Sequence, residues 1–135
     1  MLDREAEIFS SLPPHPNILK YYTHWEEDSK IYILMELCEG NNLIDFIYSD
    51  TNLLQEAKVR QILLEILRAL YFMHKHHIAH RDIKPGNIML TKDGQCKIGD
   101  YGCAKQYKPN AVLEKAETNT ACTEEYQSPE RLRSD

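Results

Sequence analysis

Four of the six histidines in this 135-residue chain lie close together, directly before Arg81 and Asp82. The cluster consists of His74, His76, His77 and His80. Two histidines four residues apart can bind zinc from one face of a helix, and His76 and His80 have that spacing. The H-E-x-x-H pattern, however, requires glutamate directly after the first histidine, where this chain has His77. We therefore expect no zinc site, and we interpret His74, His76 and His77 as polar residues at a helix end, where positive charge is favourable.

The second half of the same stretch carries a longer pattern. Residues 80–87 read HRDIKPGN, residues 100–102 read DYG, and residues 128–130 read SPE. In this order the three motifs resemble the catalytic loop, the D-F-G motif and the A-P-E motif of eukaryotic protein kinases. The resemblance covers the whole chain and implies transfer of the γ-phosphoryl group of ATP to a protein hydroxyl.

The resemblance also assigns roles to residues of these motifs. Asp82 would orient the substrate hydroxyl and accept its proton, and Lys84 would contact the transferring phosphate. Asn87 and Asp100 would bind Mg²⁺, which prefers hard oxygen ligands. The implied cofactors are therefore ATP and Mg²⁺, and the implied partner is a protein substrate.

Other segments of the chain resemble the kinase adenine pocket. Met35 would be the gatekeeper, and Glu36 and Cys38 would contact adenine through their backbones. Met89 would form the floor of the pocket. Phe9, His80 and Tyr101 would stack in the regulatory spine.

Regulatory positions follow from the same resemblance. Glu5 stands where kinases have the glutamate that pairs with the ATP-contacting lysine. Arg81 would receive a phosphorylated residue of the activation loop, because arginine pairs phosphate bidentately. Thr118 and Thr120 are the candidates for phosphorylation, whereas Thr123 would bridge Asp82 and Lys84 structurally.

The implied fold is α+β and bilobal, and this chain would hold part of it. Residues 1–40 would form the regulatory helix, the last N-lobe strands and the hinge, and residues 41–135 the first half of the mainly helical C-lobe, through the activation segment. We expect a single partial domain, because no repeat, low-complexity tract or linker divides the sequence. No G-x-G-x-x-G loop is present and no lysine precedes Glu5. Truncation at both ends is therefore expected.

The sequence Lys84-Pro85 favours a serine/threonine kinase, although Wee-type kinases carry a lysine there and act on tyrosine. Tyr101 replaces the phenylalanine of D-F-G and adds a hydroxyl that needs a partner, and Cys122 stands where the family has glycine. The alternative function is a truncated, catalytically incompetent kinase or pseudokinase that acts as a protein-binding module.

The elements that must position these residues can be predicted from periodicity and turn signals. Residues 3–12 favour a helix, residues 18–25 and 30–37 a hairpin, and residues 43–48 a short helix. Residues 56–75 predict an amphipathic helix with a wide buried stripe of Val59, Ile62, Leu63, Ile66, Leu67, Leu70 and Met73. Strands at residues 88–90 and 96–98 flank an Asp93-Gly94 turn, and an irregular loop is expected from Tyr101 onward.

Composition limits the class of protein. With 42% hydrophobic and 27% charged residues the chain resembles ordinary globular proteins, and its net charge of −5 argues against nucleic acid as a partner. No apolar run reaches the ~20 residues of a membrane span, and no secretory signal is visible, so a cytoplasmic or nuclear location without membrane contact is expected. Oligomeric state is not predicted. Cys38, Cys96, Cys103 and Cys122 form no C-x-x-C pair, so reduced thiols are expected.

Overall fold

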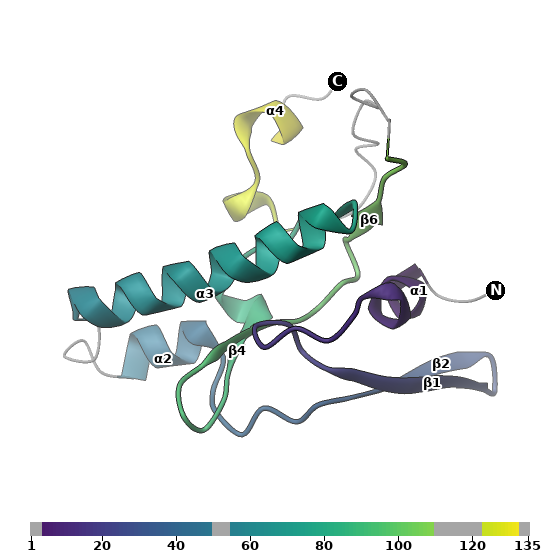
Figure 1. The fold of residues 1–135 in the computed structure, drawn as a ribbon, viewed down its shortest axis with the longest axis horizontal. Helices are drawn as coiled ribbons and strands as arrows, with labels where there is room; N and C mark the ends of the chain where they lie inside the picture. Colours follow the sequence, from purple (N-terminus) through teal and green to yellow (C-terminus); the bar gives the residue numbers. More distant parts are fainter. Residues whose placement is uncertain (1–3, 50–54, 110–122, 133–135) are drawn as a thin grey trace.

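The computed structural model describes residues 4–49, 55–109 and 123–132 (Figure 1). The first half of the chain forms α1 (Arg4–Ser11), β1 (Tyr21–Glu27), β2 (Lys30–Met35), α2 (Leu43–Ser49) and α3 (Glu56–Lys75). The second half forms β3 (Ile78–Ala79), η2 (Pro85–Asn87), β4 (Ile88–Leu90), β5 (Cys96–Ile98), β6 (Lys105–Gln106), η3 (Glu124–Tyr126) and α4 (Pro129–Leu132). Helices and short two-stranded sheets together make an α+β fold, as predicted.

The β1–β2 hairpin forms as the sequence predicts. Its strands are antiparallel, and the Trp25 and Tyr32 rings stack with centroids 5.4 Å apart. Asp28 and Ser29 turn the chain with positive φ angles of 50° and 59°. The first strand starts later than predicted, because Ile18 instead forms a parallel bridge with Ile98 in β5.

Helix α3 has the predicted bounds, but its buried face differs from the predicted stripe. The buried residues are Ile62, Glu65, Ala69 and Met73. Val59, Leu63 and Leu67 are 37%, 53% and 59% exposed, so their predicted burial is wrong. Among the described residues, the main contacts of the helix are with β5 and β3. Periodicity alone cannot tell how much of an apolar face a neighbour will cover.

Two short sheets surround the catalytic-loop motif. The predicted β4–β5 hairpin pairs Ile88 with Ile98 and Leu90 with Cys96. The β3–β6 pair and helix α4 were not predicted: β6 and α4 lie after Tyr101, where an irregular loop was expected, and no strand was predicted at residues 78–79. Strands of two residues are too short to show an alternating pattern.

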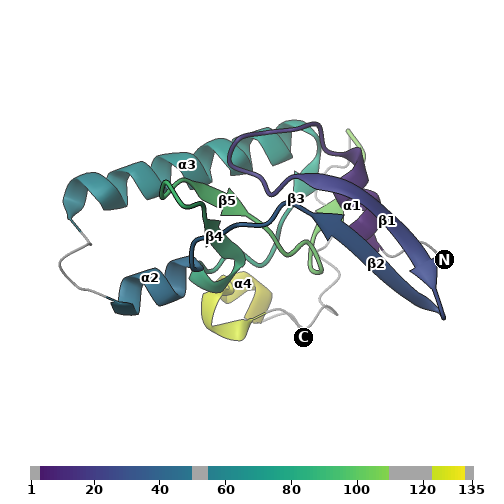
Figure 2. The same ribbon diagram turned by 90° about the horizontal axis from the view of Figure 1, so that it is seen from below.

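The main hydrophobic core joins the two halves of the chain. Its buried members include Phe9 of α1, Met73 of α3, Ile98 of β5 and Tyr101. In Figure 2, α1 and the β1–β2 hairpin lie at one end, α2 lies at the other, and β4 and β5 lie between them. The core therefore places the segment after β5 against α1.

The cysteines differ in part from expectation. Cys38 and Cys96 are free thiols, and burial raises the pKa of Cys96 to about 12. Cys103 is disulfide-bonded, so the expected reduced state is wrong for this residue. The spacing of cysteines in sequence carries no information on their distance in space. Cys122 lies outside the described residues.

None of the helices in the described part of the chain is both long enough and apolar enough to span a membrane.

Candidate active site

The segment between β3 and η2 is anchored by His80. This side chain is buried, its Nε2 lies 2.9 Å from the Gly99 carbonyl, and its Nδ1 accepts a 3.3 Å hydrogen bond from the Asp82 backbone N–H. Burial lowers the His80 pKa, and the hydrogen bond to Gly99 and the charges of Asp100 and Asp82 only partly oppose this. The imidazole is therefore neutral near pH 7, with its proton on Nε2.

The histidine cluster does not form the two-ligand arrangement of a zinc helix. Helix α3 ends at Lys75, so His76 and His80 do not share a helix face. Across residues 4–49, 55–109 and 123–132, no three His, Cys, Asp or Glu side chains are grouped to hold a metal ion.

The Asp82 carboxylate is held by hydrogen bonds from two segments. Asn87 Nδ2 donates to Asp82 Oδ2 and to the Asp82 carbonyl, both at 2.9 Å. The Thr123 backbone N–H donates to Asp82 Oδ1 at 3.2 Å, and Lys84 Nζ lies 3.4 Å from Oδ2. Burial alone would raise the pKa of Asp82, but these bonds and the lysine charge together lower it. Asp82 is therefore ionised near neutral pH.

Thr123 lies between Asp82 and Lys84. Lys84 Nζ donates a short hydrogen bond to Thr123 Oγ1, while the backbone N–H of the same threonine reaches Asp82. The structure thus brings the segment before η3 against the catalytic-loop motif, although they are far apart in sequence. Thr118 and Thr120 lie outside the described residues.

Asn87 and Asp100 line the same cavity, and backbone contacts connect their segments. The Gly99 N–H donates to the Asn87 carbonyl at 3.0 Å, and the Gly102 N–H reaches Asp100 Oδ1 at 3.3 Å. Both side-chain hydrogen bonds of Asn87 use its nitrogen, which leaves Oδ1 for a cation. An amide oxygen and a carboxylate on one cavity fit the hard-oxygen chemistry of Mg²⁺.

This cavity has a volume of about 540 Å³ and lies between the segment after β2 and strands β4 and β5. The four predicted adenine contacts, Met35, Glu36, Cys38 and Met89, all line it. Sequence reasoning missed Leu19 and Gly86 as lining residues. Leu19 belongs to no motif, and Gly86 lies in the HRDIKPGN motif but was assigned no role, so only the three-dimensional packing shows that both line the cavity.

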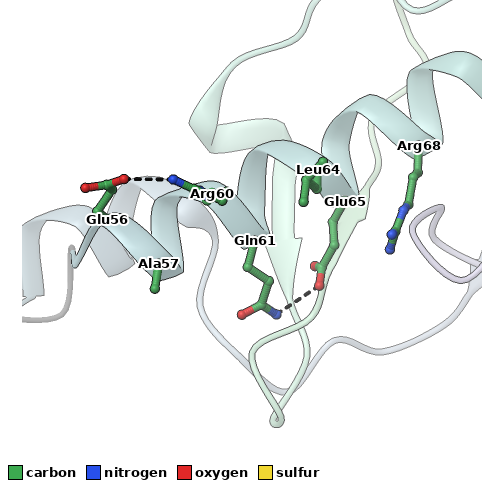
Figure 3. A pocket seen from close by; sticks show the side chains of 7 residues that line it. All are labelled: Glu56, Ala57, Arg60, Gln61, Leu64, Glu65 and Arg68. Carbon is green, nitrogen blue, oxygen red and sulfur yellow. Dashed lines mark hydrogen bonds and ion pairs between the residues drawn. The ribbon is translucent and has the colours of Figure 1, made fainter.

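A second cavity of about 620 Å³ runs along α3 (Figure 3). Its lining residues are Glu56, Ala57, Arg60, Gln61, Leu64, Glu65 and Arg68, all from this helix. Ordinary helix-surface pairs bridge it, including Arg60 with Glu56 at 2.9 Å. It is somewhat larger, but it contains no residue of the sequence motifs, so the candidate site is the 540 Å³ cavity.

The residues predicted to be regulatory contact the segment that follows β5. Glu5 Oε1 accepts a 3.3 Å hydrogen bond from the Tyr101 backbone N–H, and Glu5 also lines the 540 Å³ cavity. Arg81, whose φ is 67°, donates from Nε to the Cys103 carbonyl at 2.7 Å. Both side chains thus hold the start of the polar region after Asp100.

Tyr101 packs in an aromatic row. Its ring meets Phe9 edge-on at 4.1 Å and lies 5.3 Å from the His80 ring, so the predicted stack is present. The hydroxyl is buried and has no hydrogen-bond partner within the described ranges. The sequence indicated that this hydroxyl needs a hydrogen-bond partner, and the described residues provide none.

Compared with known protein families, residues 1–135 match the protein kinase domain. The chain belongs to the protein kinase family.

Curated relatives agree with this family. The chain is 38% identical over 130 residues to the membrane-associated tyrosine- and threonine-specific cdc2-inhibitory kinase wee-1.3 of Caenorhabditis elegans, which covers 96% of this chain and 18% of that protein. It is 36% identical over 127 residues to the serine/threonine-protein kinase PLK4 of Nematostella vectensis, covering 93% of this chain and 12% of that protein. It is 36% identical over 135 residues to the serine/threonine-protein kinase cds1 of Schizosaccharomyces pombe, covering 99% of this chain and 28% of that protein. The chain thus spans less than a third of each relative.

Proposed function

We propose that the protein carrying this chain is a serine/threonine kinase that transfers the γ-phosphoryl group of ATP to a protein hydroxyl. The observation that carries the proposal is the position of Asn87, which both holds the Asp82 carboxylate and lines the 540 Å³ cavity. The carboxylate that would orient a substrate hydroxyl and the cavity that would bind a nucleotide therefore lie next to each other. Residues 1–135 would form one partial kinase domain, divided near residue 40.

The chemistry of Asp82 suits phosphoryl transfer. Its lowered pKa makes it a weak base that orients the substrate hydroxyl in the ground state and accepts the proton as the oxygen–phosphorus bond forms. Lys84, next to Asp82, adds positive charge where the transferring phosphoryl group would be negative. Asn87 Oδ1 and the Asp100 carboxylate would hold Mg²⁺, which neutralises phosphate charge when bound.

The adenine end of the cavity would use the backbone after β2. The Glu36 N–H already donates to the Lys20 carbonyl at 2.8 Å, so the carbonyl of Glu36 is the group available to a base. Cys38, two residues on, would supply the second backbone contact. Met35 and Met89 would enclose the ring with apolar surface.

Specificity for serine or threonine is supported by the Lys84–Thr123 contact and by the relatives PLK4 and cds1, which are named serine/threonine-protein kinases. The relative wee-1.3 is named a tyrosine- and threonine-specific kinase, so threonine is a substrate residue common to the names of all three relatives. Arg81 would bind a phosphate on Thr118 or Thr120, because its guanidinium lies at the start of the segment that leads to them.

A phosphotransfer assay on the intact protein tests the proposal. The substrates are matched peptides with Ser, Thr or Tyr at one fixed position, supplied with MgATP. We expect transfer to Ser or Thr, and a decrease in kcat of about 10²–10⁴-fold for Asp82→Asn. Asp93→Asn, in the exposed β4–β5 turn, removes the same charge and should leave the rate unchanged.

Three results would change the assignment. Equal rates for wild type and Asp82→Asn would show that Asp82 is not the catalytic carboxylate. Preference for the Tyr peptide would overturn the serine/threonine assignment. Nucleotide binding without any transfer would favour the binding module instead.

A further inference from the structure

Lys97 is a buried cation to which neither the motifs nor the proposed chemistry assigns a role. It is the middle residue of β5 and is 9% exposed, whereas lysine is rarely buried without a charged partner. Its Nζ lies 3.0 Å from Oε2 of Glu36, the residue directly after β2. The pair therefore connects β5 to the segment proposed to contact adenine.

The Glu36 side of this pair is fixed by a second set of contacts. Its Oε2 also accepts a 3.1 Å hydrogen bond from the Lys20 backbone N–H, and its own N–H donates to the Lys20 carbonyl. Side chain and backbone of Glu36 are thus held to the residue that precedes β1. The carboxylate has little freedom to follow Lys97 if β5 moves.

The Lys97 side of the pair is connected to the opposite wall of the cavity. Lys97 pairs with Met89 across the β4–β5 ladder, and β5 leads through Gly99 to Asp100. Met89, Gly99 and Asp100 all line the cavity, as does Glu36 on the other side. One ion pair therefore connects the segments that form its two walls.

We propose that Lys97 is a positioning residue of the nucleotide site: through Glu36 it fixes the spacing between the adenine-contacting segment and the Asp100 segment. The inference rests on the proposed function, because it assumes that the cavity binds a nucleotide. An adenine held by the segment after β2 presents its phosphates to Asp100 only while this spacing is kept. Loss of the pair should weaken nucleotide binding.

A purely structural role for the pair gives a different result. The side chains of Lys97 and Glu36 are 11% and 26% exposed, so breaking the pair would lower thermal stability in either case. Only a positioning role also changes nucleotide affinity in protein that remains folded. The deciding measurement is therefore the Kd for MgATP, with the melting temperature recorded beside it.

The experiment uses the intact protein with Asp82→Asn as background, so that turnover is slow, and measures the Kd for MgATP by calorimetry. Lys97→Met and Glu36→Gln should each raise the Kd by about 3–30-fold, the range for residues that act on a site through others. The double variant should be no weaker than the worse single variant, because both changes remove the same pair. Lys97→Arg should restore most of the affinity.

Lys92→Met is the matched control, because it removes an exposed lysine from the turn that leads into β5. A Kd for Lys97→Met equal to that of Lys92→Met would overturn the proposal, even if the melting temperature falls. Additive effects in the double variant would overturn it as well. If Lys97→Met fails to fold, Glu36→Gln is used instead, because glutamine keeps an oxygen that can accept the Lys20 N–H. A Kd equal to that of Lys92→Met would again overturn the proposal.

Failure of the kinase assignment gives a separate signature. Wild-type protein that binds MgATP but transfers no phosphoryl group contradicts the proposed function, while the Kd comparison still decides the role of Lys97. Wild-type protein that binds no MgATP overturns both.

Discussion

The buried hydroxyl of Tyr101 makes the folded protein less stable than it would be with phenylalanine at this position. Its ring gains contacts with Phe9 and His80, and burial raises the pKa of the phenol, so the group stays neutral. A buried hydroxyl without a partner costs about 1–3 kcal/mol. The aromatic row offsets this cost through ring packing alone.

Tyr101→Phe should therefore raise the free energy of unfolding by about 1–2 kcal/mol, because it removes the hydroxyl and keeps the ring. Chemical denaturation of the two proteins measures the difference. Tyr71→Phe is the control, since Tyr71 is exposed on α3 and should show no change. A less stable Tyr101→Phe protein would show that the hydroxyl has a partner beyond the described residues.

Much of the candidate site could be predicted from the order and types of its residues. The motif around Asp82 identified which side chains to bring together, and the cavity contains each predicted adenine contact. Apart from the contacts of Thr123 and the aromatic row of Tyr101, the partners within the site could not be predicted. The bond from Tyr101 to Glu5 and the ion pair of Lys97 with Glu36 join residues far apart in sequence, where no local pattern reports distance.

Among the elements, the segment between β2 and α2 packs unusually close to the end of β4. A Cβ added at Gly40 would lie 2.3 Å from the Leu90 carbonyl oxygen and 2.9 Å from that of Thr91. The Leu90 N–H also donates to the Asn41 carbonyl at 3.1 Å. Since the obstructing atoms are backbone, no side-chain rotation can relieve the clash.

Gly40→Ala should destabilise the fold by about 1–3 kcal/mol, the usual cost of forcing extra atoms into a packed site. Thermal unfolding of the variant measures this as a lower melting temperature. Gly86→Ala is the matched control, because its added Cβ would meet only the Lys84 Cε at 4.0 Å. Equal melting temperatures for the two variants would contradict the close approach at Gly40.

Element prediction succeeded where a segment is long or has strong turn chemistry. The twenty residues of α3 show a clear helical period, and Asp93-Gly94 marks the β4–β5 turn. The two-residue strands β3 and β6 form only because they pair with each other, and this pairing depends on the tertiary structure. The orientation of α3 is equally tertiary, since its neighbours decide which residues are covered.

On the scale of the whole molecule, α3 presents an apolar surface that no described element covers. Its exposed members are Leu63, Leu64, Leu67 and Tyr71. Leu64 also lines the 620 Å³ cavity along this helix (Figure 3). Contiguous exposed apolar surface favours association between molecules. The isolated 135-residue chain is therefore expected to be poorly soluble.

Replacing Leu63 and Leu67 together by glutamine should increase the monomeric fraction of the isolated chain, because it removes apolar surface without touching the buried face. Sedimentation velocity measures this fraction, and circular dichroism checks that the helix content is kept. Tyr48→Gln, an exposed aromatic on α2, is the control and should have a smaller effect. A wild-type chain that is monomeric and melts cooperatively would contradict the expectation.

The β3–β6 pairing closes a ring of chain that runs from Ile78 to Gln106. The ring contains both Asp82 and Asp100, and the Tyr107 N–H, bonded to the His77 carbonyl at 2.7 Å, adds to its closure. The entropic cost of closing a loop grows only slowly with its length, so the short β3–β6 pairing can close this long segment. Breaking the β3–β6 pairing would release both ends of this segment together. Amide hydrogen exchange in β3 and β6 would therefore report how often the segment that carries Asp82 and Asp100 becomes disordered.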